Sequence, residues 1–485
     1  MRNDFFVRCQ PRMQVLDDEH KQEIHLASLN ILERTGILVH EEEATRLLRN
    51  AGCDVGDDGR IHIPAEVVEE AIRSVPPTIS LYDRLGRQCM MLEDRKSYFG
   101  TGSDTPHVID FETGNRRKAV LEDVERAARL ADGLDNFDFV MCMGIATDVP
   151  TELSDRYHFS AMASNSTKPI MFTAWSLDGL KDIYDMAVTI AGSEQALKRH
   201  PFIIHYAEPI APFVHPRESV EKLLFCAEKR IPVEYHCISM GGSTAPATLA
   251  GSIVQANARM LSGVVIHQLK ARGAPLIVQA PVIFLDMQTS LMPYFGPEWC
   301  LSAATSKEMA LFYGIPTFGK AGAADSKTLD QQAGVEIGMS ILAEALVGNN
   351  LIHDMGYLES GLTASLEAMV VCDEVASMAR RITRGIDLSP EHLSLDIIDR
   401  VGPKGNYLGE EHTVDYFKRE FWFPKIMDHN THEIWLAEGG KALAEKAHDE
   451  AGRILREHVP EPLAPEIRKE IEEIVNRRVQ RLRKQ

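Results

Sequence analysis

The sequence predicts an α/β protein: a (β/α)8 TIM barrel with an α+β extension before it and a helical extension after it. Short apolar runs alternate eight times with longer segments in which apolar residues recur at helical spacing. Glycine and proline mark the ends of several segments, as at Gly314 and Pro316. Polar residues collect where the apolar runs end, which is the edge at which ligands bind in parallel α/β folds.

Residues 1–96 are expected to form the α+β extension. Apolar spacing predicts helices over 16–38, 41–50 and 65–74, with a short strand at 61–63 before the last of them. Gly36 is expected to end the first helix, and Pro64 to open the third.

Residues 97–385 are expected to form the barrel. The predicted strands are 97–101, 137–144, 169–173, 202–206, 232–238, 275–279, 315–318 and 351–355. The predicted helices are 120–134, 152–164, 177–191, 217–230, 249–271, 298–313, 330–347 and 366–384. A doubly wound open sheet is the alternative, but such a sheet usually has a glycine-rich phosphate loop. Neither GxGxxG nor GxxxxGK[ST] occurs in the chain.

Residues 386–485 are expected to form a mostly helical extension. One long helix is predicted over 433–458, interrupted at Gly439-Gly440, and Pro465 is expected to open a last amphipathic helix. Large barrels with helical appendages are often oligomers, so we expect a homo-oligomer.

Composition limits the classes of partner. The 485 residues are 44% apolar and 25% charged, as in globular proteins, and the formal net charge is −19. This charge argues against nucleic acid, whose binding needs clustered lysine and arginine. It could attract a cationic substrate, or serve solubility alone. We expect no membrane span and no signal peptide, and the eight cysteines form no CxxC pair, so a reducing cytoplasm is the expected location.

The predicted strand ends supply the candidate site residues. They are Tyr98 and Asp104 around the first strand, His205 and Tyr206 on the fourth, His236 on the fifth, Gln279 and Phe284 at and after the sixth, Phe318, Lys320, Gln331 and Gln332 around the seventh, and His353, Asp354 and Tyr357 around the eighth. A single histidine at a strand end is most often structural. Three of them, His205, His236 and His353, could ligate zinc if they converged.

The aromatic residues in this set allow another reading. Ring faces attract a cation that has no N–H group, so a quaternary ammonium cage could be built from Tyr98, Tyr206, Phe284, Phe318 and Tyr357. The plainer interpretation is packing. Asp104 and Asp325 could equally be loop caps.

Four long stretches resemble one family. They are FGTGSDTPHVIDFETGNRRKA (99–119), SMGGSTAPATLAGSIVQANARMLSGVVIHQL (239–269), GPEWCLSAATSKEMALFYGIPTFGKAGAADSKTLDQQAG (296–334) and MGYLESGLTASLE (355–367). Along nearly its whole length the chain resembles the trimethylamine methyltransferase family of corrinoid-dependent enzymes. The resemblance implies a (β/α)8 barrel, a place in one-carbon metabolism, and methyl transfer from a methylamine to the cobalt of a separate small corrinoid protein.

One departure from the family is informative. Archaeal trimethylamine enzymes carry pyrrolysine in the loop after the seventh strand, and alignment on Asp325 and Gln332-Ala333-Gly334 places Gly322 there. The chain therefore resembles the non-pyrrolysine branch, known for quaternary amines such as glycine betaine. A quaternary nitrogen has no lone pair with which to attack the imine of pyrrolysine. Gly322 is also expected to vacate volume for a larger head group.

These points define the expected reaction. A methyl group leaves R–N(CH3)3+, such as glycine betaine, for Co(I) of cobalamin on a partner protein, and no cofactor is tightly bound to this chain. The expected donor to a substrate carboxylate is His353, with His205, His236, Gln331 and Gln332 as further candidates. A zinc-dependent corrinoid methyltransferase acting on another methyl donor, and a non-catalytic quaternary-amine binding protein, are the alternatives.

Overall fold

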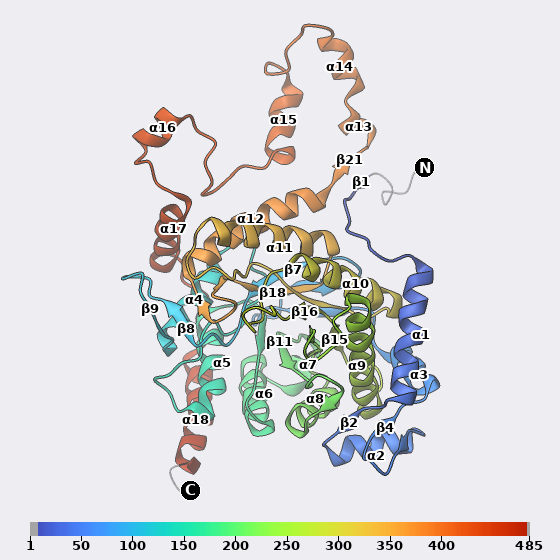
Figure 1. The fold of residues 1–485 in the computed structure, drawn as a ribbon. Helices are drawn as coiled ribbons and strands as arrows, with labels where there is room; N and C mark the ends of the chain where they lie inside the picture. The colour runs from blue at the N-terminus through green and yellow to red at the C-terminus, as the bar shows by residue number, and fades with distance from the viewer. Residues whose placement is uncertain (1–7, 483–485) are drawn as a thin grey trace.

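The computed structural model describes residues 8–482, and its central strands are parallel (Figure 1). One sheet has the order β10 (Ile170–Phe172), β11 (Ile203–Ala207), β13 (Val233–His236) and β15 (Leu276–Gln279). A second has the order β17 (Phe318–Lys320), β18 (Leu351–Met355) and β7 (Tyr98–Thr101). Isolated parallel bridges join Gly100 to Phe139, Val140 to Ile170 and Val278 to Thr317.

The predicted second strand, 137–144, makes only the first two of these bridges and no ladder. Side chains take over part of the backbone pairing with β7. The Phe99 N–H donates to Asp138 Oδ2 at 2.7 Å. Thr101 Oγ1 accepts from the Met141 N–H at 2.6 Å and donates to the Met141 carbonyl at 2.9 Å. The segment is therefore held beside β7 without being a regular strand.

Eight helices follow the central strands at or close to the predicted positions. They are α4 (Leu121–Gly133), α5 (Ser154–Asn165), α6 (Leu177–Ala191), α8 (Arg217–Lys229), α9 (Leu249–Lys270), α10 (Pro297–Tyr313), α11 (Gln331–Val347) and α12 (Leu366–Arg384). Ser176 and Ser365 cap α6 and α12 by accepting backbone N–H bonds, and both helices have the predicted bounds. Gly314 and Gly348 end α10 and α11 in the left-handed conformation. A short helix, α7 (Glu194–Arg199), was not predicted.

One apolar cluster fills the space between the central strands. It contains Phe139, Met141, Met171, Ile204, Ile277, Phe318 and Leu351, with Tyr98 and Tyr206 packed against it. The same cluster includes Ile79, Leu81, Met90 and Leu92 of a hairpin that the sequence analysis missed, β5 (Ile79–Tyr82) and β6 (Gln88–Leu92). The hydroxyl of Tyr98, the first residue of β7, accepts from the Met91 N–H at 3.1 Å. The hairpin thus closes the end of the core where the strands begin, and the other end faces the loops.

Small sheets form over the loops at both ends. The pairs are β2 (Leu38–Val39) with β12 (Val214–His215), β3 (Asp54–Val55) with β4 (Ile61–His62), and β14 (Ser239–Gly241) with β16 (Val282–Phe284). A four-stranded sheet has the order β19 (Tyr357–Leu358), β20 (Thr363–Ala364), β8 (His107–Ile109) and β9 (Arg116–Lys118). The sequence analysis treated most of these segments as loops.

The N-terminal helices α1 (Asp18–Arg34), α2 (Glu42–Asn50) and α3 (Ala65–Ser74) pack on α9. This contact explains why α9 is apolar on nearly all sides. The helix has the length and hydropathy of a membrane span, but 78% of its apolar window is buried inside the protein.

The C-terminal residues return to the body in two places. Helix α17 (Leu443–Glu457) packs on α4 and α12, and α18 (Pro465–Leu482) packs on α5 and α6. The predicted helix over 433–458 is two helices, because Gly439 and Gly440 both have positive φ and separate α16 (His432–Ala437) from α17. Between β21 (Ile386–Asp387), which pairs with β1 (Arg8–Cys9), and α16, the short helices α13 (Pro390–Leu393), α14 (Leu395–Val401) and α15 (Glu411–Glu420) project from the body (Figure 1).

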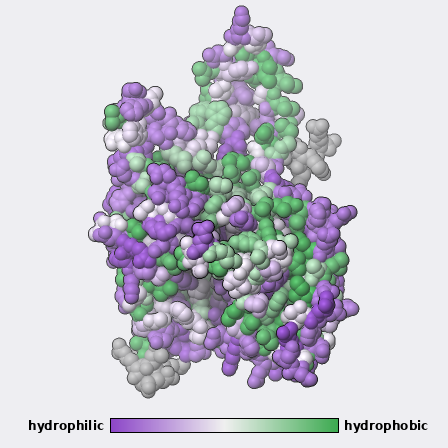
Figure 2. Space-filling view, viewed as in Figure 1, coloured by the Kyte–Doolittle hydropathy of each residue, from purple (hydrophilic) through white to green (hydrophobic). Residues whose placement is uncertain are grey.

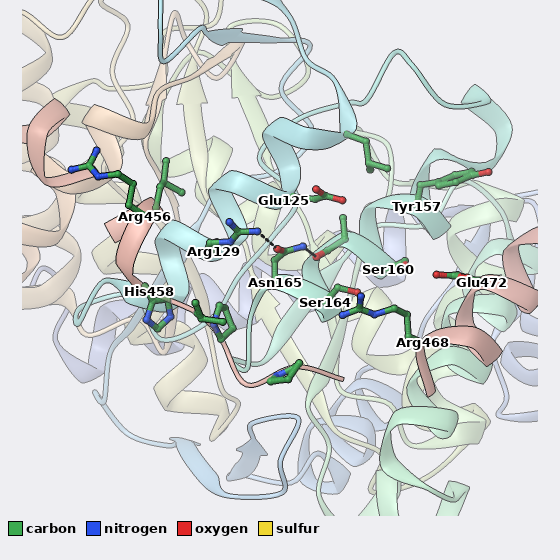
Figure 3. A pocket seen from close by; sticks show the side chains of 16 residues that line it. Glu125, Arg129, Tyr157, Ser160, Ser164, Asn165, Arg456, His458, Arg468 and Glu472 are labelled. Carbon is green, nitrogen blue, oxygen red and sulfur yellow. Dashed lines mark hydrogen bonds between the residues drawn. The ribbon is translucent and has the colours of Figure 1, made fainter. Parts of the chain in front are cut away.

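The docking of α17 and α18 leaves a hollow of 570 Å³ on the outside of helices α4 and α5 (Figure 3). Polar side chains of α4 and α5 line it, and Arg129 donates to Asn165 across it at 2.9 Å. Because helices and not strand ends form its walls, this hollow is separate from the site described next.

Candidate active site

Four aromatic rings meet at the ends of the central strands. Tyr206, His236, Phe318 and His353 come from β11, β13, β17 and β18, and all six of their centroid distances lie between 4.4 and 6.4 Å. The shortest, 4.4 Å, joins Phe318 to His353. We call these residues the four-ring cluster. The strands bring together side chains that are far apart in sequence, as parallel strands do at their carboxyl ends.

Polar atoms without a hydrogen-bond partner gather at the same place. Among the described residues, they include both carboxylate oxygens of Glu234 and Asp354, both side-chain polar atoms of Gln279, and Nδ1 of His236 and His353. Glu234 is 0% exposed. Buried polar groups are nearly always paired in folded proteins, so five such residues around one set of rings indicate a site built for a ligand.

Two close pairs within this group fall short of hydrogen bonds. Glu234 Oε1 lies 3.4 Å from His236 Nδ1, and Asp354 Oδ1 lies 3.0 Å from His353 Nδ1. In neither pair are the groups aligned for donation. The two carboxylates therefore remain available to a cation.

Burial dominates the electrostatics. It raises the pKa of Glu234 well above the ordinary value, and the nearby Glu208 adds to the rise. It lowers the pKa of His236 well below the ordinary value, with His353, Arg259 and Lys320 acting in the same direction. A bound cation would oppose the shift of Glu234 by favouring its ionised form.

The backbone is strained at two of the strand ends. Asp104 after β7 has φ 60 and Asp354 on β18 has φ 78, a region that non-glycine residues rarely occupy. Asp104 accepts from the Thr173 hydroxyl at 3.0 Å, and burial raises its pKa to about 6. Strain of this kind concentrates at functional sites, so Asp104 stays a candidate site residue.

Asp325 acts as a loop cap. Its Oδ1 accepts from the Tyr294 N–H at 2.7 Å and the Ser360 hydroxyl at 2.6 Å, and its Oδ2 accepts from the Phe295 N–H at 3.1 Å. These bonds hold the segment that carries Tyr294 above the strand ends. The ring of Tyr294 lies 6.1 Å from the ring of Tyr357.

Lys320 is a buried cation in this wall. Its Nζ lies 4.0 Å from the ring centre of Tyr294 and 4.3 Å from that of Trp299, and it donates to the Tyr294 carbonyl. No carboxylate oxygen of a described residue lies within 4.0 Å of it. Burial lowers its pKa to about 8, an effect that Asp354 and Asp325 partly oppose. The side chain is a fixed ammonium without a bonded counter-ion.

The structure does not bring the three histidines together. His205 lies on the opposite face of β11 from Tyr206, because side chains alternate along a strand. Its Nδ1 lies 3.2 Å from the Phe172 carbonyl and its ring packs on Phe172 at 5.2 Å. The zinc set of His205, His236 and His353 therefore has no common centre here.

Five other predicted site residues lie apart from the four-ring cluster. Tyr98 lies at the closed end of the core, on the hairpin of β5 and β6. Phe284 on β16 packs over Gly241, where a Cβ atom would come within 2.6 Å of its ring. Gln331 and Gln332 are exposed in the first turn of α11. Tyr357 is 2% exposed, donates to the Ser103 carbonyl and forms part of the wall between β7 and β18.

Gly322 does not vacate usable volume. It has φ 78, and a Cβ atom there would lie 2.9 Å from Met355 Cγ and 3.0 Å from Cys372 Sγ. The space that the sequence analysis assigned to a larger head group is filled by these side chains.

We expect Gly322→Ala to lower the free energy of unfolding by about 1–3 kcal/mol, through the positive φ and the crowded Cβ. Gly338→Ala on α11 is the matched control, because nothing lies within 4 Å of its Cβ and alanine favours helices by about 1 kcal/mol. Urea unfolding of both variants checks this; equal stabilities would contradict it.

A different group of residues could hold a metal ion. One ligand atom each from Asp104, Cys142 and His158 lies within 4.8 Å of the others, beside a hollow of 160 Å³. All three residues already have partners, since Asp104 accepts from the Thr173 hydroxyl at 3.0 Å. His158 Nε2 accepts from the Ala146 N–H at 3.1 Å, and the Cys142 thiol donates to the Gly144 carbonyl at 2.8 Å. A metal would have to replace these bonds, so we assign none.

Sequence reasoning missed Glu234, Tyr294 and Trp299. Glu234 had a usable signal, since a charged residue in the apolar run PVEYHCI lies two positions before His236 and so on the same face of the strand. Tyr294 and Trp299 reach the site from a loop and a helix start, which strand periodicity does not reveal.

Residues 2–483 match the trimethylamine methyltransferase (MTTB) family over nearly the whole chain. The chain belongs to this family of methyltransferases. A trimethylamine methyltransferase MttB of Desulfitobacterium hafniense is 30% identical over 459 residues, covering 94% of this chain and 92% of the relative. A glycine betaine methyltransferase from another strain of that species is 29% identical over 470 residues, covering 96% and 98%.

Solved structures share the fold of this MTTB-family chain. The monomethylamine methyltransferase MtmB of Methanosarcina barkeri aligns with a TM-score of 0.51 and 12% identity, over 93% of this chain and 96% of its own. A hydroxylamine complex of MtmB aligns with a TM-score of 0.55 and 12% identity, over 93% and 89%. At this identity the likeness concerns the fold alone.

Proposed function

We propose that the protein moves a methyl group from a small quaternary amine, such as glycine betaine, to Co(I) of a separate corrinoid protein. One observation carries the proposal. The four-ring cluster lies beside two buried carboxylates at the strand ends, Glu234 and Asp354, which have no hydrogen-bond partner within residues 8–482. Ring faces and carboxylates together are complementary to a cation that has no N–H group. The two bacterial relatives, a trimethylamine methyltransferase and a glycine betaine methyltransferase, agree with an amine methyl donor.

The residues would act by binding and orientation. The rings would hold the N(CH3)3+ group with one methyl toward the open end of the core, and Glu234 and Asp354 would balance its charge. The corrinoid supplies the nucleophilic electron pair. The C–N bond breaks, its electron pair stays on nitrogen, and a neutral tertiary amine leaves. Because positive charge leaves the amine during this step, a dry pocket favours reaction and no general base is required.

The loops that follow the central strands suit a large apolar partner. Trp175, Ile210, Met287, Leu291 and Leu362 are all between 48% and 67% exposed, in loops that follow the central strands. Exposed apolar side chains gathered in neighbouring loops are typical of a docking surface. We propose that the corrinoid protein docks there.

We also propose that the central strands close into the eight-stranded barrel, with residues 1–96 and 386–485 as its two extensions. Two features support closure. The bridges of Phe139 and Val140 connect β7 to β10, and the bridge of Thr317 connects β15 to the start of β17, so the two sheets follow one another in a cyclic order. The fold shared with MtmB agrees.

Lys320 is our candidate partner for a substrate carboxylate, ahead of His353, whose Nδ1 already lies 3.0 Å from Asp354 Oδ1. We expect Lys320→Met to weaken glycine betaine binding about tenfold to hundredfold, the cost of removing one charged partner. Binding of choline, which has no carboxylate, should be unchanged. Lys327→Met, an exposed lysine nearby, is the control. Calorimetric titration checks this. Equal losses of affinity for glycine betaine and choline would point to a structural role of Lys320.

The deciding experiment is methyl transfer to reduced corrinoid, followed by cobalt absorbance. Trimethylamine, glycine betaine, proline betaine, carnitine and choline would be tested with Co(I) cobalamin and with corrinoid proteins. Methylation by one quaternary amine and not by trimethylamine is expected. Transfer from trimethylamine alone would instead make the chain a trimethylamine enzyme. Binding without transfer would favour a binding protein, and stoichiometric zinc with another methyl donor would favour the zinc enzyme.

A further inference from the structure

The segment 386–440, which we call the arm, has almost no core of its own. All of its residues are described, and only Ile426 among them is buried. Helices α13, α14, α15 and α16 contain no buried residue. Figure 1 shows the arm rising away from the body, and Figure 2 shows apolar side chains on its surface.

The arm concentrates exposed apolar side chains. Twelve large ones are at least 42% exposed: Ile386, Leu388, Leu393, Leu395, Ile398, Tyr407, Leu408, Val414, Phe421, Phe423, Ile434 and Leu436. Leu408 is 82% exposed. With large apolar side chains offering up to about 200 Å² each, the exposed apolar area is on the order of 1,000 Å². A monomer rarely exposes so much apolar surface, and a stable dimer needs about 800 Å² from each partner.

We infer that the arm is covered by a second copy of this chain, each arm lying on the body of the other. The body has an apolar surface to receive it, since Val335 and Met339 on α11 and Ile382 on α12 are 42–58% exposed. A pair related by a twofold axis satisfies both surfaces at once. A segment without a core needs a partner that covers it at all times. A second copy is always present, at the same concentration as the chain itself.

Two observations favour a second copy over other occupants. The arm leaves the body after α12, where β21 pairs with Arg8–Cys9, beside the residues that precede β7. That is the closed end of the core, away from the opening that the proposed function reserves for the corrinoid protein. The arm also carries eleven Asp and Glu against five Lys and Arg, which disfavours an anionic membrane.

The test is the mass of the full chain in solution by light scattering. The wild type is expected at a multiple of 54.1 kDa. The triple variant Leu395→Asp, Leu408→Asp, Val414→Asp is expected as a monomer with an unchanged circular dichroism spectrum, because all three side chains are 64% or more exposed in one chain. Leu26→Asp on α1, 55% exposed, is the matched control and should keep the wild-type mass.

Other results would overturn the inference. A monomeric wild type at micromolar concentration would exclude a second copy. Protection of the arm amides from hydrogen exchange only after addition of corrinoid protein would show that the corrinoid protein covers the arm. A triple variant that keeps the oligomeric mass would place the interface elsewhere. If the triple variant unfolds, exchange protection of arm amides in the wild type, lost on dilution to monomer, decides the question. None of these readouts depends on methyl transfer.

Discussion

Glu234→Gln is expected to weaken binding of the quaternary amine strongly while making the folded protein more stable. Removing a buried charge that faces a bound cation costs about 2–4 kcal/mol, or roughly 30-fold to 1,000-fold in Kd. In the empty site, however, the carboxylate is 0% exposed and has no hydrogen-bond partner among the described residues. Replacing it removes a group that is costly to ionise there. Opposite signs for binding and stability distinguish a ligand-binding role from a structural one.

The stability gain should depend on pH. Burial raises the pKa of Glu234 in the folded state, so protonation favours folding, and the wild type loses stability as pH rises from the ordinary value of 4.5 through the folded-state value. The difference between Glu234→Gln and wild type should therefore be small at pH 4 and grow toward pH 8. Amine binding should release a proton over the same range. Thermal unfolding across pH, and calorimetry in buffers of different ionisation enthalpy, check this.

A second buried glutamate serves as a control, because it separates the effect of facing the ligand from the effect of burial alone. Glu344 is 1% exposed, its pKa is raised to about 7, and its Oε2 accepts from Asn349 at 2.7 Å on the outer side of β17. Glu344→Gln should leave amine binding unchanged. If Glu234→Gln binds the amine as the wild type does, the carboxylate does not face the cation.

Phe318 is expected to give the second large effect, because its ring contacts all three other members of the four-ring cluster and is 0% exposed. Phe318→Ala should lower the free energy of unfolding by about 3–5 kcal/mol and abolish binding through the cavity it leaves. Phe318→Leu keeps most of the volume and should cost about 1.5 kcal/mol or less in stability. It still removes the ring face, so amine affinity should fall by about 0.5–2 kcal/mol.

Ligand chemistry provides the sharper control. An analogue with a quaternary carbon in place of nitrogen has the same shape without the charge, so Phe318→Leu should bind it as the wild type does. Phe172→Leu changes a buried ring that packs on His205, outside the four-ring cluster, and should leave both ligands unaffected. Equal losses for the charged and neutral ligands would show that Phe318 acts by packing alone.

Much of the fold follows from local signals in the sequence. The bounds of α6 and α12 were predictable because a serine cap and the flanking residues are local. Strand β18 was predictable because the apolar residues Leu351, Ile352 and Met355 lie in one short segment before a glycine. The short pairs over the loops and the hairpin of β5 and β6 were missed, since they depend on partners distant in sequence.

The sequence by itself determined the alternation of central strands and helices, the family and the set of residues at the strand ends. Only the tertiary structure decided which of those side chains share a site. The central strands are buried on both faces, so hydropathy does not show which residues point inward, and Tyr206 joins the four-ring cluster while its neighbour His205 does not. The surroundings of Gly322, and the ring faces that Tyr294 and Trp299 place around Lys320, depend on contacts between distant segments. Such contacts are set by packing, which no local pattern encodes.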